Sequence, residues 1–162
     1  MAKGMFDGWT ALKDGLESIN GTTGDYFNDY ADRVFAKLVT PEEADEMPDY
    51  YLCIPFAEEP ERYEETDQHG IRCVWTQTIF GFVRDTKEDP TDTDAIELIS
   101  EIRDDLLRYF LLNPKLDSAV QEARPLSCVY IAGWAMDADY GELAMTIEIT
   151  QIVDDGDLGS AA

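Results

Sequence analysis

The end of the chain has the two-residue period of β-strands. Residues 126–134 form one apolar-rich segment, and residues 143–153 form a second, in which apolar and polar residues alternate. Alternation places apolar side chains on one face of a strand and polar ones on the other, so the second segment predicts a half-buried strand. Its apolar face would consist of Leu143, Met145, Ile147, Ile149 and Val153. Together the two segments predict a closing hairpin.

Two earlier segments also predict strands. Residues 71–85 are apolar on both faces, a pattern typical of a strand that is central in its sheet or covered on both sides. One face carries Ile71, Cys73, Trp75, Ile79 and Val83, and the other carries Val74, Phe80 and Phe82. Residues 49–56 predict a short strand, in which Pro55 lacks a backbone donor and favours a strand end or an edge.

Three segments have the apolar spacing of three and four residues that is typical of helices. The strongest lies between Pro90 and Pro114; its buried face would be Ala95, Ile99, Ile102, Leu106, Tyr109 and Phe110, with Glu101, Asp104 and Asp105 outside. A second helix over residues 25–38 would begin at Asp25 as its N-cap and bury Phe27, Tyr30, Ala31, Val34 and Leu38. The third, near the N-terminus, has a stripe of Phe6, Trp9, Leu12, Leu16 and Ile19 and is weakened by Gly8 and Gly15.

These elements predict the α+β class. We expect a mostly antiparallel β-sheet of about four strands packed against two amphipathic helices, plus an N-terminal helical segment. Residues 1–20 would form that segment, residues 25–153 a single domain, and residues 154–162 a flexible tail. The N-terminal stripe is apolar enough either to pack on its own domain or to contact another subunit.

The charge is strongly acidic, with 35 Asp and Glu against 12 Lys and Arg and a formal net charge of −23. Such a chain repels phosphate-rich partners, so duplex DNA binding is not expected as its main function. The acidic residues cluster in three segments rich in turn-forming residues, 41–49, 57–67 and 85–94, which predict solvated loops. None has the ligand spacing of an EF-hand, and no metal site is predicted.

The sequence offers little chemistry. Cys53, Cys73 and Cys128 are odd in number and lack a C-x-x-C pair, which favours buried free thiols and a reducing compartment. The single histidine, His69, lies in a polar loop, and no nucleophile–base pair or glycine-rich phosphate motif is present. We therefore expect no catalytic activity and no cofactor. No signal peptide or membrane-length apolar run appears, so the protein is expected in the cytoplasm when made.

The order of elements resembles that of the tail terminator, or minor tail protein U-like, proteins of tailed bacteriophages. The resemblance covers residues 25–153 and rests on these segments in sequence: YFNDYADRVFAKLV, YYLCIPF, IRCVWTQTIFGFVRD, ELISEIRDDLLRYFLLNPKLD, LSCVYIAGW and GELAMTIEITQIV. The N-terminal segment of residues 1–20 and the acidic loop of residues 58–68 are additions to the family's pattern.

The resemblance implies a virion protein that forms a ring, commonly a hexamer, on the tail tube and receives the head connector. Its partners would be copies of itself, the tail tube protein and the connector, without stable nucleic-acid or membrane binding. We expect the subunit interface to involve Phe6, Trp9, Leu12, Tyr50 and Tyr51. Three alternatives stay open: another phage neck or head-completion protein, an acidic inhibitor that mimics DNA, and a small enzyme or ligand-binding domain.

Overall fold

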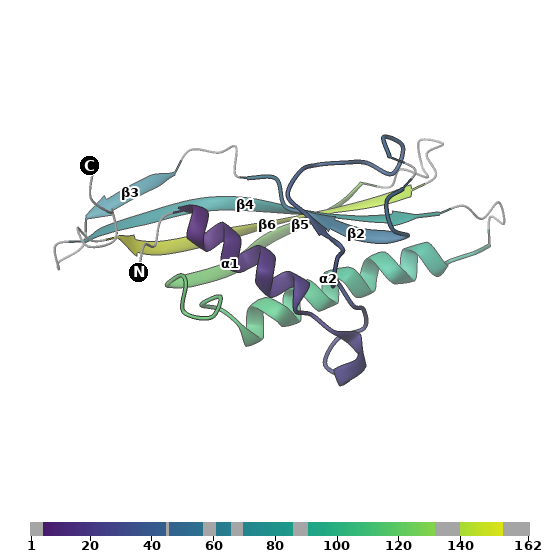
Figure 1. Ribbon diagram of the computed structural model, residues 1–162, viewed down its shortest axis with the longest axis horizontal. Helices are drawn as coiled ribbons and strands as arrows, with labels where there is room; N and C mark the ends of the chain where they lie inside the picture. Colours follow the sequence, from purple (N-terminus) through teal and green to yellow (C-terminus); the bar gives the residue numbers. More distant parts are fainter. Residues whose placement is uncertain are drawn as a thin grey trace.

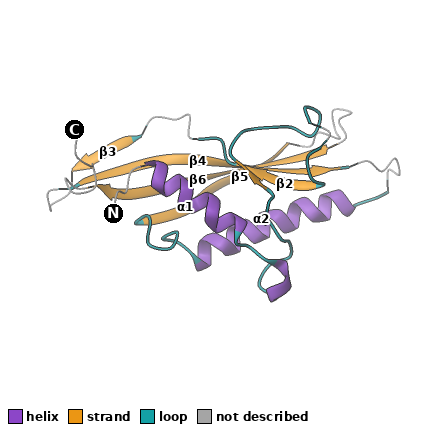
Figure 2. Ribbon diagram, in the orientation of Figure 1, coloured by secondary structure: helices purple, strands orange, loops and turns teal. Residues whose placement is uncertain are grey.

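The computed structural model describes residues 5–44, 46–56, 61–65, 70–85, 91–131 and 140–153. These residues form an α+β fold in which both α-helices lie on the same face of one mixed sheet (Figures 1 and 2). The elements are α1 (Met5–Glu17), η1 (Gly21–Thr23), β1 (Val34–Phe35), β2 (Tyr50–Cys53), β3 (Arg62–Glu65), β4 (Ile71–Arg84), α2 (Asp94–Leu112), β5 (Glu122–Ile131) and β6 (Tyr140–Val153).

The sheet has six strands in the order β1-β2-β4-β6-β5, and β3 pairs with β4 beyond the end of β2. Strands β1 and β2 are parallel and all other pairs are antiparallel. The predicted α+β class is confirmed, and β2, β4, β5 and β6 are the four expected strands. Two short strands were not expected: β1, which adds the parallel pair, and β3, which lies within an acidic segment predicted to be a loop.

The main core lies between the helices and the sheet. On β6, Leu143, Met145, Ile147 and Ile149 are fully buried, as the alternation predicts, while Val153 at the strand end is partly exposed. The buried face of α2 contains all six residues expected there. Strand β4 is central, with β6 on one side and β2 and β3 on the other, which confirms the inference from its two apolar faces.

Helix α1 packs on this core through Leu12 and Leu16, both fully buried. Residues 5–20 therefore pack on the domain core. Gly15 allows the close approach, because a Cβ there would lie 1.8 Å from the hydroxyl oxygen of Tyr109 on α2. The glycine lowers the intrinsic stability of the helix but permits its packing.

The predicted helix over residues 25–38 is wrong. This segment is irregular apart from β1, and Asp32 has a φ of 58°, which no right-handed helix contains. Two of its backbone N–H groups, those of Phe27 and Asn28, donate to the Asp105 carboxylate on α2 at 2.8 and 3.1 Å. Asp105 is therefore buried rather than outside, and Asp25 caps no helix.

The face of the sheet opposite the helices is covered at one end only. There Tyr51, Cys53 and Phe82 form a second buried cluster, against which Phe35, Met47, Phe80 and Tyr140 pack. The segment that follows β1 curves over this end of the sheet (Figure 1), and its Val39 carbonyl accepts a hydrogen bond from the Tyr51 hydroxyl at 2.6 Å. We call the sheet face opposite the helices the open face.

Candidate assembly surfaces

Strand β5 forms one edge of the sheet. It pairs with β6 on one side, and no strand in the described part of the chain covers the other. Three of its apolar side chains are exposed: Leu126 by 49%, Val129 by 55% and Tyr130 by 47%. An edge strand with exposed apolar residues is a site for association, although the bulge between Pro125 and Ser127 and the missing donor of Pro125 interrupt its backbone.

Helix α2 extends this apolar surface. Ile96, Leu107 and Leu111 share a face that points away from its buried side, and Leu111 is 81% exposed. Arg103 lies on the same side of the helix, near Tyr130 of β5. Its hydrogen bond to Asp104 and, secondly, its interaction with Tyr130 raise the pKa of Arg103. The β5-edge surface is defined as Ile96, Leu107, Leu111, Leu126 and Tyr130; Val129 pairs with Ala144 and points to the open face instead.

A second apolar surface lies at the opposite edge of the sheet, where α1 meets the end of β2. The rings of Phe6 and Trp9 stack with centroids 6.0 Å apart, and Phe56 contacts Trp9 edge to face at 6.0 Å. The Trp9 indole donates to the Ile54 carbonyl at 2.9 Å, which fixes this arrangement. A small hollow of about 160 Å³ adjoins Phe56 and Leu38. The aromatic edge surface is defined as Phe6, Trp9 and Phe56; Leu38 lies across the hollow, beside Thr76 and Thr78 of the open face.

The expected interface residues divide between surface and core. Phe6 is 65% exposed and Trp9 is half-buried, so both belong to the aromatic edge surface. Leu12 and Tyr51 are fully buried within the chain, and their assignment to an interface is wrong. Tyr50 is half-buried by internal contacts: its hydroxyl donates to the Asp29 carbonyl at 3.0 Å, and the Arg33 guanidinium lies 4.0 Å from its ring centroid.

Sequence reasoning missed the β5-edge surface. The signal was present in the segment LLRYFLL, which is apolar around more of the helix than one buried face requires. Leu106, Tyr109 and Phe110 fill the core, so Leu107 and Leu111 remain as an apolar excess.

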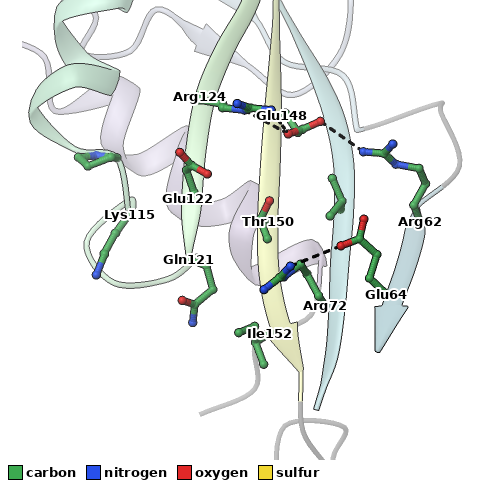
Figure 3. Close-up of a pocket in the computed structure, with 12 residues that line it drawn as sticks. Arg62, Glu64, Arg72, Lys115, Gln121, Glu122, Arg124, Glu148, Thr150 and Ile152 are labelled. Atoms are coloured by element: carbon green, nitrogen blue, oxygen red, sulfur yellow. Dashed lines mark hydrogen bonds and ion pairs between the residues drawn. The ribbon is translucent and has the colours of Figure 1, made fainter. Parts of the chain in front are cut away.

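A third feature is a shallow, charged depression on the open face, with a volume of about 830 Å³ (Figure 3). Glu148 on β6 accepts from Arg124 on β5 at 2.9 Å and from Arg62 on β3 at 3.3 Å, and the two arginines point toward it from opposite sides. Glu64 pairs with Arg72 at 3.5 Å. The charged depression is defined by Arg62, Glu64, Arg72, Lys115, Glu122, Arg124 and Glu148.

The charge of this depression differs from that of the chain. It holds four of the 12 basic residues and three of the 35 acidic residues, so its formal charge is +1 on a chain of −23. Lys115 forms no ion pair with any described residue. Two of the arginines, Arg62 and Arg124, have side chains that are more than half exposed. The depression is therefore the place where the open face can accept anionic groups.

No protein-family model matches the chain, and no curated protein matches it. The assignment of function depends on the surfaces themselves.

The remaining chemistry of the described residues is modest. Burial raises the pKa of the Cys53 thiol to about 11 and also raises the pKa values of Cys73 and Cys128, so all three thiols stay protonated and weakly nucleophilic at neutral pH. They are free, as expected, with Cys53 and Cys73 buried and Cys128 half-buried. Among the described residues, no group of three or more His, Cys, Asp or Glu could hold a metal ion, and no helix is long and apolar enough to cross a membrane. His69 and residues 154–162 lie outside the described residues.

Proposed function

We propose that this protein is a structural subunit that assembles side by side into a closed ring. The aromatic edge surface of one copy packs against the β5-edge surface of the next. The observation that carries the proposal is the presence of two different apolar surfaces at opposite edges of the same sheet. A contact between unlike surfaces is heterologous, and repeating it generates a ring when the rotation closes and a filament when it does not.

The ring would act as a bacteriophage tail terminator. In that role it caps the tail tube, and its exposed face receives the head connector. The order of strands and helices supports this reading, because an amphipathic long helix followed by a two-strand ending resembles that family. The proposal includes a hexamer as the ring, located in the virion, with the tube protein and the connector as partners.

The physical chemistry of the two surfaces suits association. Burying Leu111 and Leu107 against aromatic rings removes apolar area from water at about 25 cal/mol per Å². Phe6 and Trp9 add large, rigid side chains of the kind that dominate interfaces. The net charge of −23 opposes association at low ionic strength, so rings should form more readily as salt screens the repulsion.

Light scattering coupled to size exclusion tests the proposal. Leu107→Glu combined with Leu111→Glu should convert the ring to smaller species, because it places two charges in the contact. Leu112→Glu is the matched control, since Leu112 is also exposed but lies on a different side of α2, outside the β5-edge surface. A wild-type protein that stays monomeric at high concentration and high salt would contradict the proposal. So would equal effects of the control and the double variant.

A further inference from the structure

The two ends of the open face carry opposite features. At one end is the charged depression, formed on β3, β4, β6 and β5. At the other end, residues 40–44 and 46–49 cover the second buried cluster. Met47 packs against this cluster, and the Arg84 guanidinium donates to the Ala44 carbonyl at 2.8 Å. The register of β4 with β6 places Arg72 and Phe82 on the same face. They are ten residues apart, which is about 33 Å along the strand.

The covering segment is acidic and raised above the sheet. Glu42, Glu43 and Glu46 are exposed on it, and no basic residue lies between Thr40 and Asp49. The depression at the other end is hollow and carries a net positive charge. The raised acidic end and the hollow basic end are therefore complementary in both shape and charge.

Both features point in the same direction, away from the helices. The raised end of one copy can reach the depression of another only if two open faces turn toward each other with their strands reversed. In that arrangement the second contact forms whenever the first does, because a two-fold axis relates them. Between the two ends, the open face presents Thr76, Thr78, Ala144 and Thr146 together with the larger Phe80 and the exposed Val129. Two sheets that pack through such faces lie about 10 Å apart.

We infer that the open face is a second interaction surface, whose partner is the open face of another copy of this chain. The acidic segment, represented by Glu42 and Glu46, occupies the charged depression, where Lys115 and the Arg62–Glu148–Arg124 cluster receive its carboxylates. This contact is isologous, whereas the proposed ring contact is heterologous. The two contacts use different surfaces, so either can exist without the other.

The test uses two full-length variants, each of which should dimerise poorly alone, while a mixture of the two should form a mixed dimer. The depression variant carries Lys115→Glu and Arg62→Gln, which leaves Arg124 to pair with Glu148. The loop variant carries Glu42→Lys and Glu46→Lys. Each alone brings like charges together at both contacts, so its dimerisation Kd should rise by about tenfold or more. Mixing them restores opposite charges at both contacts, and a mixed dimer should form at close to the wild-type Kd.

Both variants are made in the Leu107→Glu/Leu111→Glu background, so that only the open-face contact is measured. The expected species there is a dimer, at twice the chain mass of 18.3 kDa. Lys13→Glu is the control for Lys115→Glu, because it makes the same Lys-to-Glu change on α1, on the opposite side of the sheet. Circular dichroism confirms that each variant is folded.

Each outcome has a clear meaning. Loss of the dimer in both variants, with recovery on mixing and no loss in the control, supports the open-face contact. A monomer in the background variant, no recovery on mixing, or an equal loss in Lys13→Glu overturns it. The ring proposal is read separately, from the wild-type protein and its Leu112→Glu control. A depression variant that loses binding to a different, acidic protein while the dimer persists would also overturn the self-contact.

Discussion

Asp105 should contribute more to the stability of the fold than any other carboxylate on α2. It is 1% exposed, and its oxygens accept four hydrogen bonds: from the Phe27 and Asn28 backbone N–H groups, the Asn28 amide and the Tyr30 hydroxyl, at 2.8 to 3.1 Å. Burial and the Asp105 carboxylate raise the pKa of the Tyr30 hydroxyl, which keeps that group a donor at all ordinary pH values. A single side chain therefore holds residues 27–30 against α2.

The cost of removing it follows from these bonds. In Asp105→Ala the fully buried Tyr30 hydroxyl loses its acceptor, at about 1 to 3 kcal/mol, and the two backbone N–H groups lose charge-assisted bonds that water can replace in part. We expect the free energy of unfolding to fall by about 3 to 5 kcal/mol, a large share of the roughly 5 to 15 kcal/mol typical of a domain. The stability of Asp105→Asn should lie between those of the wild-type protein and Asp105→Ala, because asparagine keeps one acceptor oxygen.

Urea denaturation monitored by tryptophan fluorescence measures this loss, and Asp104→Ala is the matched control. The Asp104 side chain is 44% exposed, with Arg103 as its ion-pair partner, so its removal should cost less than about 1 kcal/mol. Hydrogen exchange should also show the amides of Phe27 and Asn28 exchanging faster in Asp105→Ala. Equal losses for Asp104→Ala and Asp105→Ala would refute the reasoning.

Three further predictions concern the core. Gly15→Ala should destabilise the fold despite the better helix propensity of alanine, since its Cβ would overlap the Tyr109 hydroxyl; a stabilised variant in urea denaturation would show that Tyr109 can move aside. Ile102→Ala and Leu106→Ala should each lower the free energy of unfolding by about 2 to 5 kcal/mol, and losses below 1 kcal/mol would place these residues outside the core. Burial raises the pKa of Tyr109 to about 12, above the ordinary value of 10, so the unfolded chain releases this proton first and stability should fall as pH rises from about 10 to 12. Tyr109→Phe should lessen that fall in denaturation series at fixed pH, and an unchanged slope would contradict the assignment.

The elements predicted correctly are those whose patterns reflect burial against a sheet. Strand β6 alternates because one of its faces is buried and the other is on the open face, and β4 is apolar on both faces because the second cluster covers Phe82. The buried face of α2 follows from spacing alone. In each case the regular spacing of apolar residues along the element reflects its packing over most of its length.

The errors arose where a distant residue determines local structure. Residues 25–38 have helical spacing, but Asp105, more than seventy residues away, offers their backbone N–H groups another acceptor. Strand β3 was hidden in an acidic run, because its pairing is supported by cross-strand charges such as Glu64 with Arg72 rather than by apolar periodicity. Neither partner can be identified from the neighbouring sequence.

The candidate surfaces were predicted only in part. Phe6 and Trp9 were identified because apolar side chains on a helix near a terminus are buried either in their own domain or against another subunit. Leu12 belongs to the same stripe but points into the core, which the spacing of a short helix does not distinguish. The charged depression brings together residues from β3, β4, β5, β6 and the connection before β5, so no single segment reveals it.

The central claim is that unlike edges of neighbouring copies meet, and crosslinking from Phe6 tests it most directly. A photoreactive phenylalanine analogue at this exposed position is activated in the assembled protein, and mixed isotope labelling separates crosslinks between copies from those within one copy. We expect crosslinks between copies from position 6 to residues 96–112 of α2 or 122–131 of β5. Crosslinks between copies that join position 6 to the N-terminal helix of another copy, or none at all between copies, would contradict it.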